Sequence, residues 1–214
     1  MYGGRTRGRF GGLAPARWDF MSLSLLVLGI GSFLFHATLR QTMQLVDDVS
    51  MLLLAWSMLQ SVCAVRQTPT LVWAINTGLT VSVCAFAAFY VWTGEILYHT
   101  FGFLTMMSFL TGRSRYIIHW MEPRLAGKER RWNSRTWLSM FWTMFGYVLW
   151  TIDLEFCKEL RELRTRVGLP WAWVLELHGW WHVLTAMGAS QFMEIAREMR
   201  EEAKREEAKR EKRE

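Results

Sequence analysis

Residues 29–51 read GIGSFLFHATLRQTMQLVDDVSM, and this stretch places polar groups inside what are otherwise two hydrophobic helices. Ser32 and His36 stand four residues apart, so a helix carries them on one face. Asp47 and Asp48 stand at the start of the next apolar run. The stretch therefore predicts two apolar helices joined by a short turn, with reactive side chains close to that turn.

A second polar motif lies near the other end of the chain, where residues 175–190 read LELHGWWHVLTAMGAS. His178 and His182 form an HxxxH pair, which a helix again carries on one face. The apolar segments therefore contain three histidines, one serine and an acidic pair. These side chains are the candidates for a functional site.

The composition indicates a membrane protein. Hydrophobic residues make up 51% of the 214 residues, and they include 13 Trp, 13 Phe and 13 Met. They occur in blocks of about 20 residues, the length that crosses a hydrocarbon core. The mean hydropathy is only +0.08 because the charged ends and one basic loop lower it. Three cysteines cannot form a self-contained disulfide framework.

The blocks predict an all-α polytopic bundle with six transmembrane helices in a single catalytic domain, residues 18–195. We expect residues 1–17 to be a polar, flexible N-terminus and residues 196–214 a charged cytosolic tail, and we place a basic loop at 113–135. The expected helices are 18–39, 43–64, 71–92, 96–111, 136–156 and 174–195.

The distribution of basic residues predicts the orientation. With six helices, the side of the membrane that holds both termini carries 20 of the 25 Lys and Arg residues. Such an excess is typical of the cytosolic side, so both termini are expected there. The charges are confined to loops and tails, which excludes a nucleic-acid surface. On this topology His36, Asp47, His178 and His182 share one depth, on the non-cytosolic side.

Ionisable groups at the centre of a membrane helix cost roughly 2.5–3.5 kcal/mol on insertion scales. A single histidine is best explained as a hydrogen-bonded structural residue, and we interpret His99 and His119 in this way, with His119 at the membrane interface near Trp120. Three histidines at one depth, His36, His178 and His182, instead favour a zinc site over a structural polar cluster. Three histidines plus water is an established catalytic zinc arrangement, and zinc lowers the pKa of bound water to about 7.

Ser32 and Asp47 are the candidate catalytic side chains. Ser32 is either a helix-packing hydroxyl or a hydrogen-bond donor to a reacting carbonyl oxygen. Asp47 is either a cap or counter-charge, or a general base beside the zinc-bound water. Asp48 points about 100° away and receives less weight. The Trp180–Trp181 pair is interpreted as packing or as an interfacial anchor.

The patterns GxGSxxFHxTLxxxxQxxDD and ExHxWWHxLTxxG, with the run WTIDLEFC at 150–157, resemble the alkaline ceramidase family of membrane amidases. The resemblance covers residues from about 10 to 195. It implies an enzyme that cleaves the amide of ceramide-type lipids to a sphingoid base and a fatty acid. It also implies that three histidines hold zinc, that a serine lies on the oxyanion side, and that an aspartate transfers protons. By motif position these residues are His36, His178, His182, Ser32 and Asp47.

The sequence departs from the family pattern at two places. Asp48 and Ser50 stand where the family usually has Glu and Pro. Family members also resemble seven-helix proteins, whose additional first helix follows an acidic, Trp-containing segment linked to calcium. We expect that helix and that calcium site to be absent from this sequence.

The resemblance implies an endoplasmic reticulum or Golgi membrane, with no nucleic-acid partner. Two alternatives stay open. One is a lipid-binding protein similar to the progestin and adiponectin receptor group, and the other is an inactive truncated ceramidase. The ExHxWWHxLT block favours the enzyme. The sequence leaves the preferred ceramide and the oligomeric state open.

Overall fold

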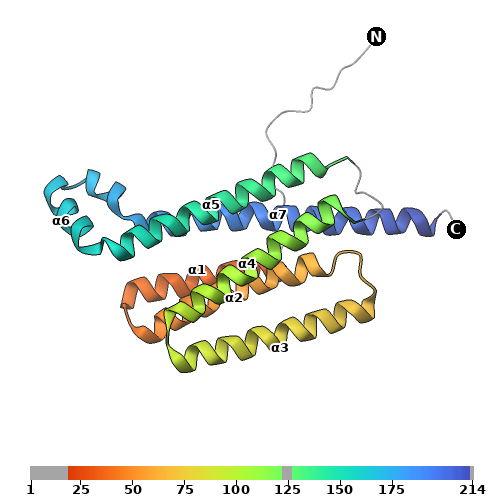
Figure 1. Cartoon of the computed structure of the whole chain (residues 1–214), viewed down its shortest axis with the longest axis horizontal. Coiled ribbons are helices and arrows are strands. Elements are labelled where there is room, and N and C mark those ends of the chain that lie inside the picture. The colour runs from red at the N-terminus through yellow and green to blue at the C-terminus, as the bar shows by residue number, and fades with distance from the viewer. Residues whose placement is uncertain (1–18, 122–126, 213–214) are drawn as a thin grey trace, which may run out of the picture.

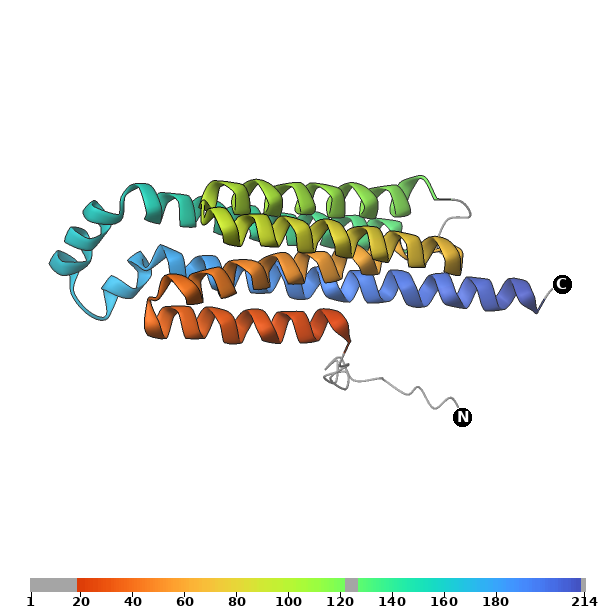
Figure 2. The ribbon, with the colours of Figure 1, turned by 90° about the horizontal axis from the view of Figure 1, so that it is seen from below.

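The computed structural model describes residues 19–121 and 127–212, and these residues form a bundle of long helices that run side by side (Figures 1 and 2). The described part of the chain has no β-strand, which confirms the all-α prediction. The expected N-terminus, 1–17, lies outside the described residues. The elements are α1 (Phe20–Thr38), α2 (Gln41–Cys63), α3 (Pro69–Thr93), α4 (Ile96–His119), α5 (Glu129–Glu155), α6 (Cys157–Val167), the 3-10 helix η1 (Trp171–Leu175) and α7 (Leu177–Glu211).

Local signals explain where the first helices begin and end. The Asp19 side chain accepts a hydrogen bond from the Ser22 backbone N–H and so caps α1. Leu39 adopts the left-handed conformation, with φ 52°, and turns the chain directly into α2. Gly94, with φ 68°, makes the corresponding turn between α3 and α4. These short turns make neighbouring helices antiparallel, so the end of α1 and the start of α2 lie together.

The bundle has the character of a helical membrane protein. Among the described residues, α1, α2 and α3 are long and apolar enough to cross a membrane by length and composition. Tyr90 is the single fully buried residue of α3, and α1 has only three, Met21, Ser24 and Gly31. The large apolar side chains on their outer faces suit contact with lipid, as in other membrane helices. α4, α5 and α7 run alongside them and are also at least 24 residues long.

Helices continue well into the segment that was expected to be a basic loop, 113–135. α4 extends to His119 and α5 begins at Glu129, so helix occupies most of that range. The basic residues of this range were interpreted as a solvated loop, whereas some of them pair with acidic residues of α7. Arg135 contacts Glu194 at 2.6 Å, and Lys128 contacts Glu202 at 2.6 Å.

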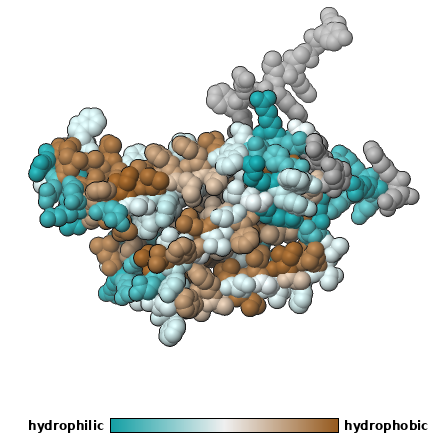
Figure 3. Space-filling model, viewed as in Figure 1, coloured by the Kyte–Doolittle hydropathy of each residue, from teal (hydrophilic) through white to brown (hydrophobic). Residues whose placement is uncertain are grey.

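α7 also continues beyond residue 195, through most of the expected charged tail, as one helix to Glu211. Its extension buries Ala196, Met199 and Ala203 in the bundle core. Facing it, the fully buried Trp132 of α5 donates its indole N–H to Glu198 at 2.8 Å. Figure 3 shows hydrophilic surface at this end of the molecule, as well as at the end that carries α6. The tail is therefore partly a structural element and not only a solvated appendage.

α5 and α7 form the most extensive helix pair, and small residues allow their close approach. A Cβ atom at Gly188 would lie 2.6 Å from the Thr143 hydroxyl and 2.8 Å from the Ser139 carbonyl oxygen. Small residues serve the same purpose in many membrane helix pairs. The contact fixes α7 against α5 next to the segment that carries the HxxxH motif.

The Asp19 carboxylate joins the start of α1 to α7, since it accepts two hydrogen bonds of 2.8 Å from the Arg197 guanidinium. These bonds hold the pKa of Asp19 below its usual value. Arg197→Gln should lower the free energy of unfolding by about 1 kcal/mol, since both side chains are partly shielded from water. The contribution should be present above about pH 4 and decline as the pH falls further, because Asp19 then becomes protonated.

Thermal unfolding in detergent at several pH values measures this effect. Lys204→Gln, which removes the same charge from an exposed position on the same helix, is the matched control. Equal unfolding temperatures for the two variants at pH 7 would contradict the assigned role of the Asp19–Arg197 pair.

Candidate active site

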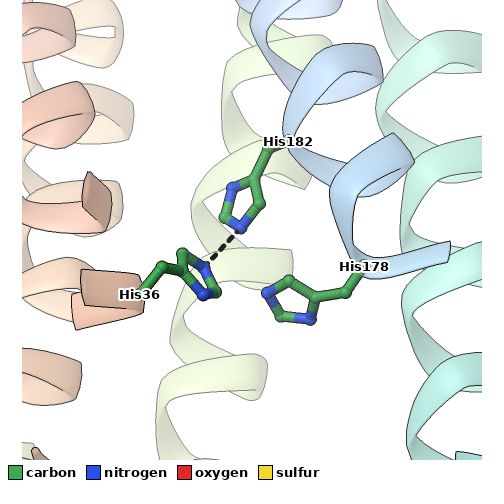
Figure 4. A group of neighbouring side chains, drawn as sticks. All are labelled: His36, His178 and His182. Atoms are coloured by element: carbon green, nitrogen blue, oxygen red, sulfur yellow. Dashed lines mark hydrogen bonds between the residues drawn. The ribbon is translucent and has the colours of Figure 1, made fainter. Parts of the chain in front are cut away.

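Three imidazoles converge where the end of α1 meets the start of α7 (Figure 4). His36 lies in the last turn of α1, while His178 and His182 occupy successive turns at the start of α7. One nitrogen from each ring lies within 4.8 Å of the others. The Nε2 atoms of His36 and His182 are 3.0 Å apart. Residues separated by 146 positions thus come together as the sequence predicted.

This geometry fits a tetrahedral metal ion. At the usual zinc–nitrogen distance of about 2.0–2.1 Å, neighbouring tetrahedral ligands lie roughly 3.3 Å from each other. The three nitrogens already approach that spacing, and none of the three rings is tied to a carboxylate in the described structure. His36, His178 and His182 can therefore supply three ligands to a metal ion, and His36 and His182 also border the adjoining cavity.

That cavity has a volume of about 450 Å³ and is bordered by four of the predicted site residues, Ser32, His36, Asp47 and His182. Asp47 is only 6% exposed. Its Oδ1 atom is buried and has no hydrogen-bond partner among the described residues. The Ser32 hydroxyl lies close enough to interact with the same carboxyl group. A buried oxygen without a partner is costly, which makes Asp47 the clearest candidate for a group that bonds a ligand or water.

The cavity continues away from the histidines between α1, α2, α4, α5 and α7, and its walls are almost entirely apolar. Apart from Ser32, the hydroxyl groups that line it donate hydrogen bonds to helix backbone oxygens. Ser139 donates to the Gly188 carbonyl oxygen at 2.7 Å, and Thr185 donates to the Trp181 carbonyl oxygen at 2.6 Å. The space therefore suits a hydrocarbon chain better than a polar ligand.

Asp48 faces away from the cavity and has partners of its own. The Tyr90 hydroxyl of α3 donates a hydrogen bond of 2.5 Å to Asp48 Oδ2. His99 of α4 lies with its Nε2 3.0 Å from the Asp48 carbonyl oxygen, where a protonated nitrogen donates a bond. All three side chains are buried. The cluster ties α3 and α4 to the turn of α2 that carries Asp47.

Arg164 of α6 links the end of α5 to the start of α7, next to the histidines. Its guanidinium contacts Asp153 near the end of α5 at 3.3 Å and Glu176 just before α7 at 2.9 Å. Glu176 stands two residues before His178, so this bridge helps to position the start of α7. The adjacent Trp181 packs against Tyr147 and Trp150 of α5, in keeping with its interpretation as a packing residue.

The sequence did not single out Tyr90 or Arg164. Tyr90 sits in the apolar run CAFAAFYVW, where an aromatic residue is expected for packing alone. Arg164 is one of several alternating charges in KELRELRTR. Neither position has a local pattern that predicts its partner. His99, in contrast, is a hydrogen-bonded core residue as predicted, and His119 lies on the other end of α4 beside Asn133.

The Tyr90–Asp48 bond should contribute measurably to stability. Tyr90→Phe leaves a buried carboxyl group without its donor, which typically costs about 1–3 kcal/mol. The variant should melt at a lower temperature in detergent than Tyr98→Phe, in which the altered ring is exposed. If both variants melt at the temperature of the unaltered protein, the bond does not hold α3 to α2.

Sequence comparisons match this chain to one protein family. The sequence model of the Ceramidase family matches residues 9–213. Alkaline ceramidase 3 of Mus musculus is 31% identical over 171 residues, which cover 78% of this chain and 60% of that protein. Alkaline ceramidase YPC1 of Saccharomyces cerevisiae (strain ATCC 204508 / S288c) is 27% identical over 185 residues, covering 76% of this chain and 55% of that protein. The chain spans less than two thirds of the length of either relative.

Proposed function

This chain belongs to the ceramidase family, and we propose that it is a zinc-dependent amidohydrolase that cleaves ceramides within the membrane to a sphingoid base and a free fatty acid. The observation that carries the proposal is the meeting of three imidazoles, a buried carboxyl group and a hydroxyl at one end of an apolar cavity. The names of the two relatives, both alkaline ceramidases, support the same substrate class.

His36, His178 and His182 would hold the zinc ion. When bound, zinc supplies Lewis acidity and lowers the pKa of a coordinated water toward neutrality. The surroundings suit this role because His36, on α1, and the pair on α7 are set by helix packing and by the Arg164 bridge.

The chain's own groups account for the proton movements of amide hydrolysis. Asp47 Oδ1, buried beside the cavity and without a partner, is placed to accept a proton from the attacking water. The same proton can then pass to the amide nitrogen, so that the sphingoid amine leaves as the carbon–nitrogen bond breaks. Ser32 is placed to donate its hydroxyl hydrogen to the carbonyl oxygen as that oxygen becomes negative.

The apolar cavity is the proposed binding site for the hydrocarbon chains of the lipid. Ceramides carry two long hydrocarbon chains, and transfer of such chains into an apolar site is strongly favourable. Phe33 on α1 and Phe103 on α4 are among the residues that line this cavity. A chain lying between these helices would bring the amide to Ser32 and Asp47 while its apolar walls exclude bulk water.

We also propose the orientation that the charge distribution predicts, with both termini in the cytosol and the histidines near the non-cytosolic surface. The basic ends of α4, α5 and α7, which lie together at the opposite end from the histidines, support this orientation. An endoplasmic reticulum or Golgi location is part of the same proposal.

Loss of the metal is the first test. The purified protein should contain about one zinc ion per chain by elemental analysis, since three histidines can supply its protein ligands. His178→Ala and His182→Ala should each lower both the zinc content and ceramide hydrolysis. His119→Ala, at the far end of α4, should retain both. A protein that lacks His178 and His182 and still binds zinc with full activity would refute the assigned ligands.

Ser32 and Asp47 should affect the rate without affecting the metal. Ser32→Ala should lower kcat by about 10²–10³, the usual loss for one oxyanion donor. Asp47→Asn should lower it by about 10²–10⁴ through lost proton transfer. Zinc content and melting temperature are measured first, and Ser108→Ala, at an exposed serine of α4, is the control.

The unaltered protein, assayed beside these variants, separates the enzyme from a lipid-binding receptor. If labelled ceramide binds to the unaltered protein and no sphingoid base or fatty acid is released, the catalytic proposal fails. If both variants unfold while the surviving fraction keeps full activity, Ser32 and Asp47 have structural roles only.

A further inference from the structure

Residues 156–175 form a polar and aromatic segment that projects beyond the ends of α1 to α4 (Figure 1). It comprises α6 and η1 and connects α5 directly to α7. Its second half, LPWAWV, exposes large apolar side chains to an unusual degree. Leu169 is 79% exposed, Trp171 69% and Trp173 76%. Such exposure outside the long helices calls for a partner, because contiguous apolar surface marks a site of contact.

The first half of the segment is an amphipathic helix. Phe156, Leu160, Leu163 and Val167 recur at intervals of four, three and four residues, which places them on one face. None of the residues of α6 is buried. The intervening positions carry exposed basic and acidic side chains, so apolar and charged surfaces lie next to each other at this end of the molecule (Figure 3). The exposed basic residues are Lys158, Arg161 and Arg166.

The position of the segment relative to the bilayer is set by its neighbours. α5 ends at Glu155 and α7 begins at Leu177, so both ends of the segment are attached to long helices of the membrane bundle. The Arg164 bridge to Asp153 and Glu176 holds it close to those helix ends. It therefore lies at the level where a hydrocarbon core gives way to lipid headgroups.

We propose that residues 156–175 lie in the headgroup region of the non-cytosolic leaflet, with Trp171, Trp173 and the apolar face of α6 inserted among the lipids. Tryptophan is enriched at this level because its ring is apolar and its N–H is polar. An amphipathic helix with basic residues on its polar face lies in the plane of such an interface. The continuity with α5 and α7 favours lipid over another protein, since the segment reaches the bilayer surface without any assembly step.

The test measures the depth of single side chains in the reconstituted protein. Cys63, Cys84 and Cys157 are first replaced by Ala, and one cysteine is introduced by Trp171→Cys for an environment-sensitive fluorophore. The matched control is Glu162→Cys, on the charged side of α6. The protein is placed in phosphatidylcholine vesicles, with lipids brominated near the headgroup as one quencher and aqueous iodide as the other.

The label at position 171 should be quenched severalfold more by brominated lipid than the label at 162, and severalfold less by iodide. Trp173→Cys provides a second position with the same expectation, in case the first substitution alters the fold. Equal access of iodide to the labels at 171 and 162 would overturn the proposal. So would protection from iodide that disappears when the lipid-to-protein ratio is raised, because that result identifies a second copy as the partner. No readout depends on ceramide hydrolysis, so failure here is distinct from failure of the proposed activity.

Discussion

Polar side chains inside a membrane bundle need polar partners, and this constraint determines where they lie in the structure. A charged or polar side chain facing hydrocarbon is costly, so helices place such groups toward the bundle interior and toward one another. Here the histidines, Asp47 and Ser32 gather at one end, whereas the ionic pairs of α5 and α7 gather at the other. The apolar cavity occupies the length between them. The division follows from the cost of dispersing these groups along the helices.

The histidine cluster depends on how firmly two helices are held. The last turn of α1 carries His36, and the tight turn at Leu39 that follows brings the start of α2 alongside. α7 is held along its length by α5, through the close contact at Gly188 and, farther on, through Glu198 with Trp132. A rigid frame of this kind matters for a site whose ligands come from distant parts of the chain, because small displacements change metal geometry.

Sequence reasoning located the parts of the site that periodicity reveals. The HxxxH pair and the Ser32–His36 pair lie on single helical faces, and the charge asymmetry predicts which helix ends meet. Periodicity within one helix does not predict which residues of different helices contact each other. The basic residues of 113–135 were interpreted as a loop because acidic partners such as Glu194 and Glu198 lie 59 and 63 residues from Arg135, on α7. The bond from Tyr90 to Asp48 likewise joins two apolar helices at positions that no repeat connects.

Asp47 and Asp48 illustrate how packing assigns different roles to identical neighbours. Successive residues on a helix point about 100° apart, so the two carboxyl groups cannot share one environment. Tyr90 and His99 engage Asp48 and thereby fix the rotation of α2 about its axis. With α2 held in that rotation, Asp47 has to face the cavity, where its Oδ1 lacks any partner in the described structure. The hydrogen bonds that Asp48 makes on the opposite side of the same helix thus offset the free-energy cost of leaving Asp47 Oδ1 unpaired.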